Sequence, residues 1–223
     1  MSNVRSLNNH PLERVLVKNA FVFLLLGAMS IQPFAQPSSW SEFMGGRRAS
    51  YSTKGNPKAK GVEVSFEYPS SWGGADGKRP NILYQVTSEQ GKGLDLCNLG
   101  VKDIPVAPGQ SFSKADIEEL FDPSDLNWVL GGAGTLTAGK RTTIDGQPAA
   151  QVQFTREVDR AGTQYQMMGV MYPIYFRNKL IIFTCMSGDS ATTPAEQLKA
   201  RYRGALPLFQ QLANTLVIHS KWK

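Results

Sequence analysis

The sequence has few of the residues that carry metal and acid–base chemistry. Only two of its 223 residues are cysteine and only two are histidine. One histidine, His10, lies in a segment that we interpret below as a removed leader, which leaves His219 alone in the mature chain. The mature chain therefore offers few ligands for a metal centre built from Cys and His, and a single histidine as the base of a catalytic triad.

Long apolar runs are also missing. The apolar stretch at residues 20–29 (AFVFLLLGAM) is about ten residues long, whereas a membrane-spanning helix needs about 20. Three basic residues precede it and a polar stretch ending at Ala35 follows, which is the order typical of a secretory signal peptide. We expect residues 1–35 to be cleaved, with Ala28 and Ser30 offering an alternative site upstream and a permanent anchor as the alternative interpretation. The mature protein is then periplasmic or secreted.

The composition of the full chain is that of a folded protein. Hydrophobic residues make up 41% and charged residues 19%, with a mean hydropathy of -0.26. This balance is too apolar for a disordered chain and too polar for a polytopic membrane protein. The length is sufficient for one domain of ordinary size.

Export changes how the two cysteines are interpreted. In an oxidising compartment a pair of cysteines favours a disulfide over a metal site or a catalytic thiol. Cys97 and Cys185 lie in strand-like runs, LDLCNL and LIIFTCM, which suits a bridge between two packed strands. The sequence predicts this disulfide, with two unpaired buried thiols as the alternative.

The positive charge is concentrated in one stretch. Residues 36–60 hold five basic residues against Glu42, a net of +4, whereas the chain from residue 62 onward is neutral. Because this stretch is rich in Gly, Ser, Pro and Lys and shows no periodicity, we interpret it as a flexible arm outside a single domain at residues 61–220. We therefore expect that deleting the arm leaves the thermal transition of the domain nearly unchanged. The five basic residues are Arg47, Arg48, Lys54, Lys58 and Lys60.

Such an arm suggests several roles. A basic segment with aromatic neighbours can dock on an acidic protein or on an anionic membrane surface, and a solubilising tail is the simpler alternative. Nucleic-acid binding by the domain itself is not expected, because the domain has no surplus positive charge.

From residue 62 the pattern changes to alternating strands divided by turns. Asp145-Gly146 is a strong hairpin signal, and the continuous apolar run at residues 179–187 indicates a central strand. Ser113 and Asp116 predict a helix start, Ser124 a second one, and Thr193 with Pro194 and Glu196 a terminal helix that Pro207 should kink or split. The sequence thus predicts an α+β fold in which helices flank an antiparallel sheet.

These elements resemble a known superfamily. FEYPSSW at 66–72, TTIDGQPAAQVQF at 142–154, KLIIFTC at 179–185 and LFQQLANTLVI at 208–218 are similar to the Mog1/PsbP/DcrB-like α/β/α sandwich. The resemblance covers roughly residues 61–218 and rests on structural patterns, with no functional residue carried over. It implies a non-enzymatic binding or assembly factor, because most members have that role.

No catalytic motif stands out. Residues 134–140 fit the start of a phosphate-binding loop, but Arg141 stands where a Ser or Thr must hold magnesium, and the segment leads into a hairpin. His219 is interpreted as a surface histidine. Five acidic residues are interpreted as a solvated helix face rather than a cation site: Asp116, Glu118, Glu119, Asp122 and Asp125. We expect no catalytic residue, no metal and no cofactor.

The richest local feature is a strand of methionines and aromatics at residues 165–176. Packing on both faces is one interpretation, and an apolar face left open to a partner is the other. Together with Trp72 in a Gly-rich loop, Tyr172 and Tyr175 are therefore candidate partner-binding residues. The function predicted from the sequence is that of an exported protein-binding or assembly factor. An inhibitor or immunity-type protein that neutralises a toxic enzyme, and a hydrolase with an unrecognised site, are the alternatives.

Overall fold

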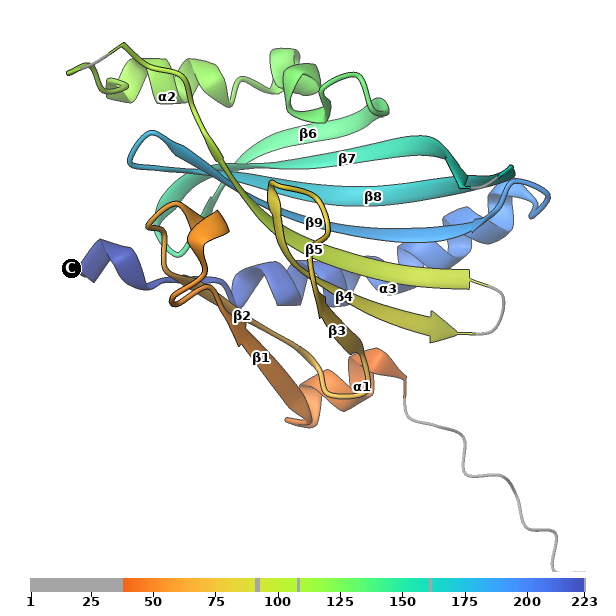
Figure 1. The fold of residues 1–223 in the computed structure, drawn as a ribbon. Coiled ribbons are helices and arrows are strands. Elements are labelled where there is room, and N and C mark those ends of the chain that lie inside the picture. Colours follow the sequence, from red (N-terminus) through yellow and green to blue (C-terminus); the bar gives the residue numbers. More distant parts are fainter. Residues whose placement is uncertain (1–37, 91–92, 108, 161, 223) are drawn as a thin grey trace, which may run out of the picture. The chain divides into compact units, whose positions relative to one another are not determined.

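The computed structural model describes residues 38–90, 93–107, 109–160 and 162–222, so the predicted leader at 1–35 lies outside the described residues. The described residues belong to one compact unit, Gln36–Lys223. This unit holds a seven-stranded antiparallel sheet (Figure 1). In spatial order its strands are β3 (Gly73–Asp76), β4 (Ile82–Gln90), β5 (Gly93–Asp103), β9 (Lys179–Ser190), β8 (Thr163–Phe176), β7 (Gln147–Arg160) and β6 (Thr135–Ile144).

A second, three-stranded sheet and a set of helices complete the unit. The small sheet has the order β1 (Arg48–Ser52), β2 (Val64–Pro69) and β10 (Val217–Ile218). The α-helices are α1 (Ser39–Met44), α2 (Lys114–Leu120) and α3 (Ala195–Asn214), and the 3-10 helices are η1 (Pro57–Ala59), η2 (Pro123–Leu130) and η3 (His219–Trp222). The predicted α+β class is confirmed. Among the residues that the structure describes, no helix combines the length and apolarity needed to cross a lipid bilayer.

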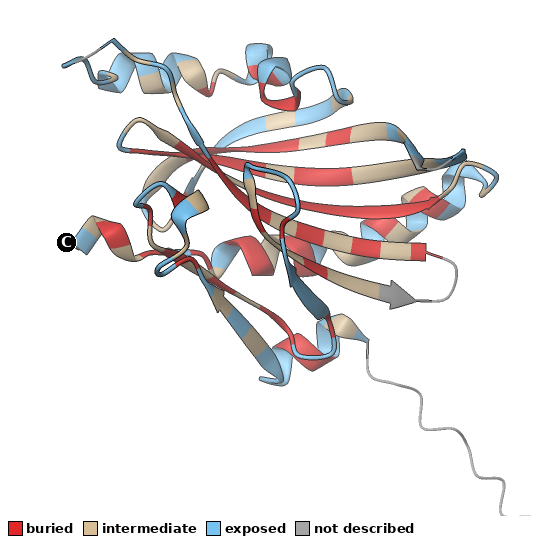
Figure 2. Ribbon diagram, viewed as in Figure 1, coloured by how far each residue is buried: buried red, intermediate tan, exposed pale blue. Residues whose placement is uncertain are grey.

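The large sheet is covered on both faces. Helix α3 lies against β8 and β9 on one face, and η2 lies against β6 on the other (Figure 1). Two apolar clusters result, one around Phe183 and Phe209 on the α3 side and one around Phe121 and Leu126 on the η2 side. The central strands are accordingly the most deeply buried (Figure 2). The predicted central position of β9 is confirmed, because β9 lies between β5 and β8.

The strand of methionines and aromatics packs on both faces, as one interpretation of the sequence had it. Strand alternation turns Met167, Met171 and Tyr175 toward the η2-side cluster. The other face of β8, which includes Tyr172, packs into the α3-side cluster. Tyr172 and Tyr175 are both buried, so the prediction that they form an open partner surface is wrong.

The hairpin turns follow the sequence signals. Asp145 and Gly146, with φ values of 48° and 73°, connect β6 to β7. Arg177 and Asn178, with φ values of 47° and 58°, connect β8 to β9. Two successive positive φ values fit the twist of an antiparallel pair, and this explains why Asp-Gly is such a reliable signal.

The helix boundaries differ from the prediction in three details. The predicted capping box of Ser113 and Asp116 is present at α2, but Asp122 rather than Ser124 caps η2. At α3 the N-cap position belongs to Pro194 without a side-chain hydrogen bond, so Thr193 is not the cap. Pro207 does not split α3, which continues to Asn214 because a buried apolar stripe anchors the helix on both sides of the proline.

The predicted flexible arm is wrong for the described residues 38–60. Helix α1, strand β1 and helix η1 lie in this segment, and β1 pairs with β2 along its whole length. Phe43 is only 2% exposed, and the ring of Tyr51 stacks on Tyr84 with 3.9 Å between centroids. The outer edge of β2 supplies unpaired backbone groups, and β1 satisfies them. This pairing orders a segment whose composition resembles a linker.

The buried carboxylate of Glu42 links α1 to the turn after β2 through hydrogen bonds. Glu42 accepts hydrogen bonds from the Ser70 hydroxyl at 2.8 Å and from the Ser71 backbone N–H at 2.9 Å, and also from the Ser71 hydroxyl. Burial alone would raise the pKa of this carboxyl, but the hydrogen bonds from Ser71 and Ser70 outweigh burial and lower the pKa below the ordinary 4.5. The ionised form is therefore the one that the fold stabilises.

Glu42→Gln is expected to destabilise the protein at neutral pH and to matter less in acid. Because the folded-state pKa is lowered, the stabilisation is present above the unfolded value and is lost as the pH falls through the folded value. Urea unfolding of the wild type and of the variant at pH 7 and pH 3 measures the difference. Glu196 has a side chain that is 83% exposed, so Glu196→Gln is the control and should show no such pH dependence.

The predicted disulfide is present. Cys97 on β5 and Cys185 on β9 are directly paired in the strand register and bonded to each other, with 4.0 Å between their Cα atoms. Both are completely buried in the α3-side cluster. The bridge therefore joins two neighbouring central strands that are 88 residues apart in sequence.

Candidate functional site

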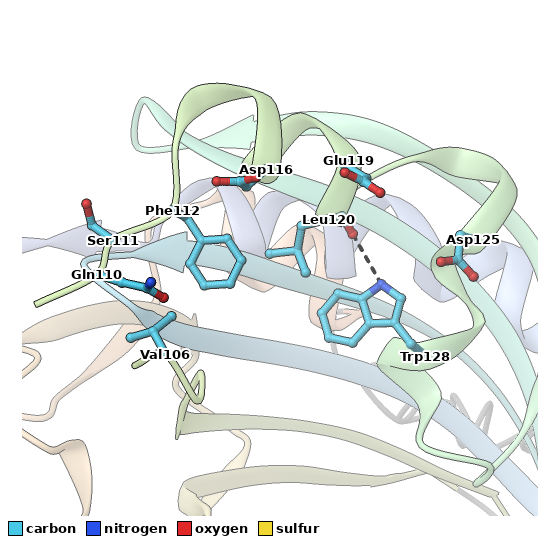
Figure 3. Close-up of a pocket in the computed structure, with 9 residues that line it drawn as sticks. All are labelled: Val106, Gln110, Ser111, Phe112, Asp116, Glu119, Leu120, Asp125 and Trp128. Carbon is cyan, nitrogen blue, oxygen red and sulfur yellow. Dashed lines mark hydrogen bonds between the residues drawn. The ribbon is translucent and has the colours of Figure 1, made fainter. Parts of the chain in front are cut away.

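An open pocket lies between the segment at residues 106–112 and the helices α2 and η2. Its volume is about 390 Å³. Figure 3 shows the Phe112 and Trp128 rings with Leu120 between them. The nine lining residues are Val106, Gln110, Ser111, Phe112, Asp116, Glu119, Leu120, Asp125 and Trp128. The pocket thus combines aromatic walls with three carboxylates, and none of its nine lining residues is basic.

The aromatic walls are held in place by neighbouring elements. Trp128 is 39% exposed, and its indole Nε1 donates a hydrogen bond to the Leu120 carbonyl at 3.2 Å, which joins η2 to the end of α2. The Phe112 ring packs edge-on against Tyr175, with 5.7 Å between centroids. Tyr175 in turn donates to Asn178 Oδ1 at 2.8 Å. A predicted partner-binding residue, Tyr175, thus supports the pocket from beneath.

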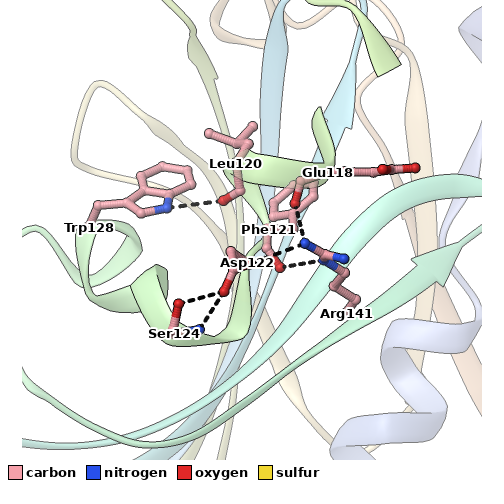
Figure 4. Close-up of polar contacts among 7 residues, drawn as sticks. All are labelled: Glu118, Leu120, Phe121, Asp122, Ser124, Trp128 and Arg141. Carbon is pink, nitrogen blue, oxygen red and sulfur yellow. Dashed lines mark hydrogen bonds and ion pairs between the residues drawn. The ribbon is translucent and has the colours of Figure 1, made fainter. Parts of the chain in front are cut away.

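Arg141 on β6 holds the α2–η2 connection from the sheet side (Figure 4). Its Nη2 donates to the Glu118 carbonyl at 2.7 Å and its Nε to the Phe121 carbonyl at 3.1 Å. It also pairs with Asp122 at 3.4 Å. These carbonyls lie at the C-terminal end of α2, where no further helical turn donates to them, so the guanidinium satisfies acceptors that the helix leaves unpaired.

Two of the acids near the pocket, Asp116 and Asp122, are stabilised in their ionised form. The Ser113 hydrogen bonds lower the pKa of Asp116, and the Ser124 hydrogen bonds lower the pKa of Asp122. Only Asp116, Glu119 and Asp125 of the five acids line the pocket. Within the described ranges, no three His, Cys, Asp or Glu side chains come together closely enough to hold a metal ion.

Sequence reasoning missed the aromatic part of this pocket. The acids were interpreted as a solvated face, and Phe112 and Trp128 were not considered. One signal was present: Trp128 lies off the buried stripe of η2, which consists of Leu126, Val129 and Leu130. A large aromatic residue on the exposed side of an amphipathic segment is a better guide to a binding surface than one on the buried side.

The structure does not support the predicted partner-binding residues as one surface. Trp72 is buried, and its Nε1 donates to Ser39 Oγ at 3.0 Å. Three of the basic residues have partners inside the protein: Arg48 with Glu67, Lys58 with the Gly77 carbonyl, and Lys60 with Asp103. Arg47 and Lys54 are exposed.

The sequence suggested that His219 is a surface histidine, but in the structure it contacts β2. It is half-buried, and its Nε2 lies 2.8 Å from the Ser65 hydroxyl on β2. The nearby Asp145 carboxylate accepts hydrogen bonds from the Ile218 backbone N–H and from Lys221 Nζ. These contacts fasten the C-terminal segment to β2 and to the β6–β7 turn.

Comparisons with known proteins find a few distant structural matches. No family model matches the chain, and no curated protein matches its sequence. LpqN, described as involved in cell envelope biogenesis of Mycobacterium tuberculosis, is 10% identical, with a TM-score of 0.43 over 78% of this chain and 93% of that chain. PA94 of Pseudomonas aeruginosa, described as a protein of unknown function and putative regulator, is 19% identical, with a TM-score of 0.38 over 69% and 90%. A Bacteroides thetaiotaomicron protein is 14% identical, with a TM-score of 0.35 over 72% and 46%.

The resemblance to the Mog1/PsbP/DcrB-like superfamily is therefore not confirmed at the level of a family. The α+β architecture that it implied is present in the structure itself, with helices on both faces of an antiparallel sheet.

Proposed function

We propose that this chain is an exported, non-enzymatic accessory protein that binds a partner protein through the α2–η2 pocket. The observation that carries the proposal is an open pocket whose lining contains three carboxylates and two aromatic rings and no basic residue. The predicted leader and the disulfide support an extracytoplasmic location, because disulfides persist in oxidising compartments.

The chemistry of the pocket favours a basic side chain of the partner. A guanidinium or ammonium group is attracted to the face of an indole by about 0.5–2 kcal/mol, and Trp is the best of the aromatic residues for this contact. A carboxylate of the lining, that of Asp116, Glu119 or Asp125, can then pair with this cation, and a carboxylate binds a guanidinium through two parallel hydrogen bonds. The pocket therefore fits an exposed arginine in a basic segment.

The proposed binding surface lies outside residues 36–60, where the sequence had placed it. The predicted basic arm was expected to dock on an acidic partner or an anionic membrane surface, whereas the acidic pocket requires a basic partner. An inhibitor of a toxic enzyme is compatible with the same surface if that enzyme presents a basic segment. Loss of the enzyme's activity on addition of the protein would distinguish an inhibitor from an assembly factor.

Trp128→Ala is expected to weaken the binding of a basic peptide about tenfold, because the variant loses the cation–π contact and one wall of the pocket. The probe is a tetra-arginine peptide titrated into the mature protein by calorimetry. Trp222→Ala removes an indole that is 77% exposed and lies outside the pocket lining, so it is the matched control and should leave the affinity unchanged.

A tetra-glutamate peptide should not bind, and high salt should weaken tetra-arginine binding, because the attraction is between opposite charges. Equal affinities of the wild type and Trp128→Ala for tetra-arginine would place the binding surface elsewhere.

A further inference from the structure

A second pocket lies at the corner of the large sheet where β6 begins. Its volume is about 370 Å³, and it shares no lining residue with the α2–η2 pocket. The register of β6 and β7 starts at Thr135 opposite Thr155. From Arg156 onward, β7 pairs with β8 alone, so the pocket forms beside a stretch of edge strand.

One residue of this pocket, Arg156, has a hydrogen-bond donor without an acceptor. Its Nε is buried and has no hydrogen-bond partner, and none of the described residues forms an ion pair with its guanidinium. Burial first, and then the positive charge of Arg79, lower the pKa of Arg156. A partly buried guanidinium next to a second cation is stabilised when an anion accompanies it.

The nearest acid in the pocket lining does not supply that anion. Glu157 also lines the pocket, but it directly follows Arg156 in the strand, and alternation turns neighbouring side chains to opposite faces of the sheet. The side chain opposite Arg156 in the register is Met167, which is apolar. The face of β7 that carries Arg156 is therefore both cationic and apolar.

The remaining lining supplies both polar and apolar contacts. Thr135 and Thr155 contribute hydroxyl groups, which can donate to an oxyanion, whereas Met167, Met168 and Leu198 contribute apolar surface. Methionine side chains adapt to chains of different shape. Arginine binds carboxylate and phosphate groups through its planar array of donors.

We propose that this corner pocket binds a dissolved amphiphilic oxyanion, a carboxylate or phosphate that carries a short apolar chain. Arg156 binds the headgroup and Met167 covers the adjoining part of the chain on the same face, while Met168 and Leu198 contact the rest of the chain across the open edge of β7. This site is independent of the α2–η2 pocket, so either proposal can fail without the other.

The test is a calorimetric titration of the mature protein with octanoate, octyl phosphate, octanol and inorganic phosphate. We expect octanoate and octyl phosphate to bind, and octanol and inorganic phosphate to bind at least tenfold more weakly. Arg156→Met should reduce octanoate affinity at least tenfold. Arg203→Met, at an exposed arginine of α3, and Glu157→Gln should not reduce it. Failure of both octyl anions to bind, binding of octanol as tight as that of octanoate, or capture by phosphatidylglycerol vesicles without binding of either octyl anion would overturn the proposal.

Thermal unfolding supplies a second readout that a purely structural role would not reproduce. Because no described residue pairs with Arg156, Arg156→Met should leave the Tm unchanged or raise it, whereas octanoate should raise the Tm of the wild type only. A fall in the Tm of Arg156→Met, together with no effect of octanoate on the wild type, would assign Arg156 a structural role and overturn the proposal.

Discussion

Phe43→Ala is expected to lower the free energy of unfolding by about 3–5 kcal/mol, the cost of removing a large aromatic side chain from a core. Phe43 lies in α1, is 2% exposed and belongs to the α3-side cluster. Phe43 also contacts Arg48, whose guanidinium lies 4.3 Å from the ring centroid and whose Nε donates to the Phe43 carbonyl at 2.8 Å. Urea unfolding followed by circular dichroism measures the change.

Met44→Ala is the matched control for this experiment. Met44 is the next residue of the same helix but is 51% exposed, so its truncation should change the stability by less than about 0.5 kcal/mol. If Phe43→Ala behaved like Met44→Ala, residues 38–60 would be the loose arm that the composition suggested. Deleting residues 38–60 should accordingly destabilise the domain more than Phe43→Ala does, because β2 then loses its β1 partner as well.

Removing the disulfide is expected to destabilise the protein by about 2–5 kcal/mol. Cys97 and Cys185 are 88 residues apart in sequence, so their bond restricts a large part of the unfolded chain. The double variant Cys97→Ala/Cys185→Ala removes the bond without leaving an unpaired thiol. Its thermal transition should lie well below that of the oxidised wild type.

Reduction provides the control for this prediction. Dithiothreitol should lower the Tm of the wild type toward that of the double variant, and it should leave the double variant unchanged. A wild type insensitive to dithiothreitol under conditions that permit transient unfolding would contradict a stabilising role of this bond. The deep burial of both cysteines makes reduction in the native state slow, so the reductant is added before heating in denaturant.

Local chemistry predicted much of the fold. Asp145-Gly146 specified a hairpin, the Ser113 and Asp116 pair specified the start of α2, and the apolar run around Phe183 specified a central strand. In each case, the information lies in a few adjacent residues: backbone freedom at a turn, a side chain that caps a helix, or burial on both faces of a strand. The disulfide was also predictable, because only two cysteines were available.

What the sequence by itself determined was therefore the class of fold, the crosslink and most of the turns. Only the tertiary structure decided that residues 38–60 form part of the core, since the edge of β2 that orders them is not visible in their own composition. Only the tertiary structure brought Phe112, Trp128 and three acids to one pocket, and left Arg156 without a partner among the described residues. Phe43 and the pocket around Arg156 depend on contacts between residues distant in sequence, whereas a turn or a cap is formed by neighbours. The lining of the α2–η2 pocket lies within residues 106–128, but its shape depends on how this segment packs on Arg141 and Tyr175 of the large sheet.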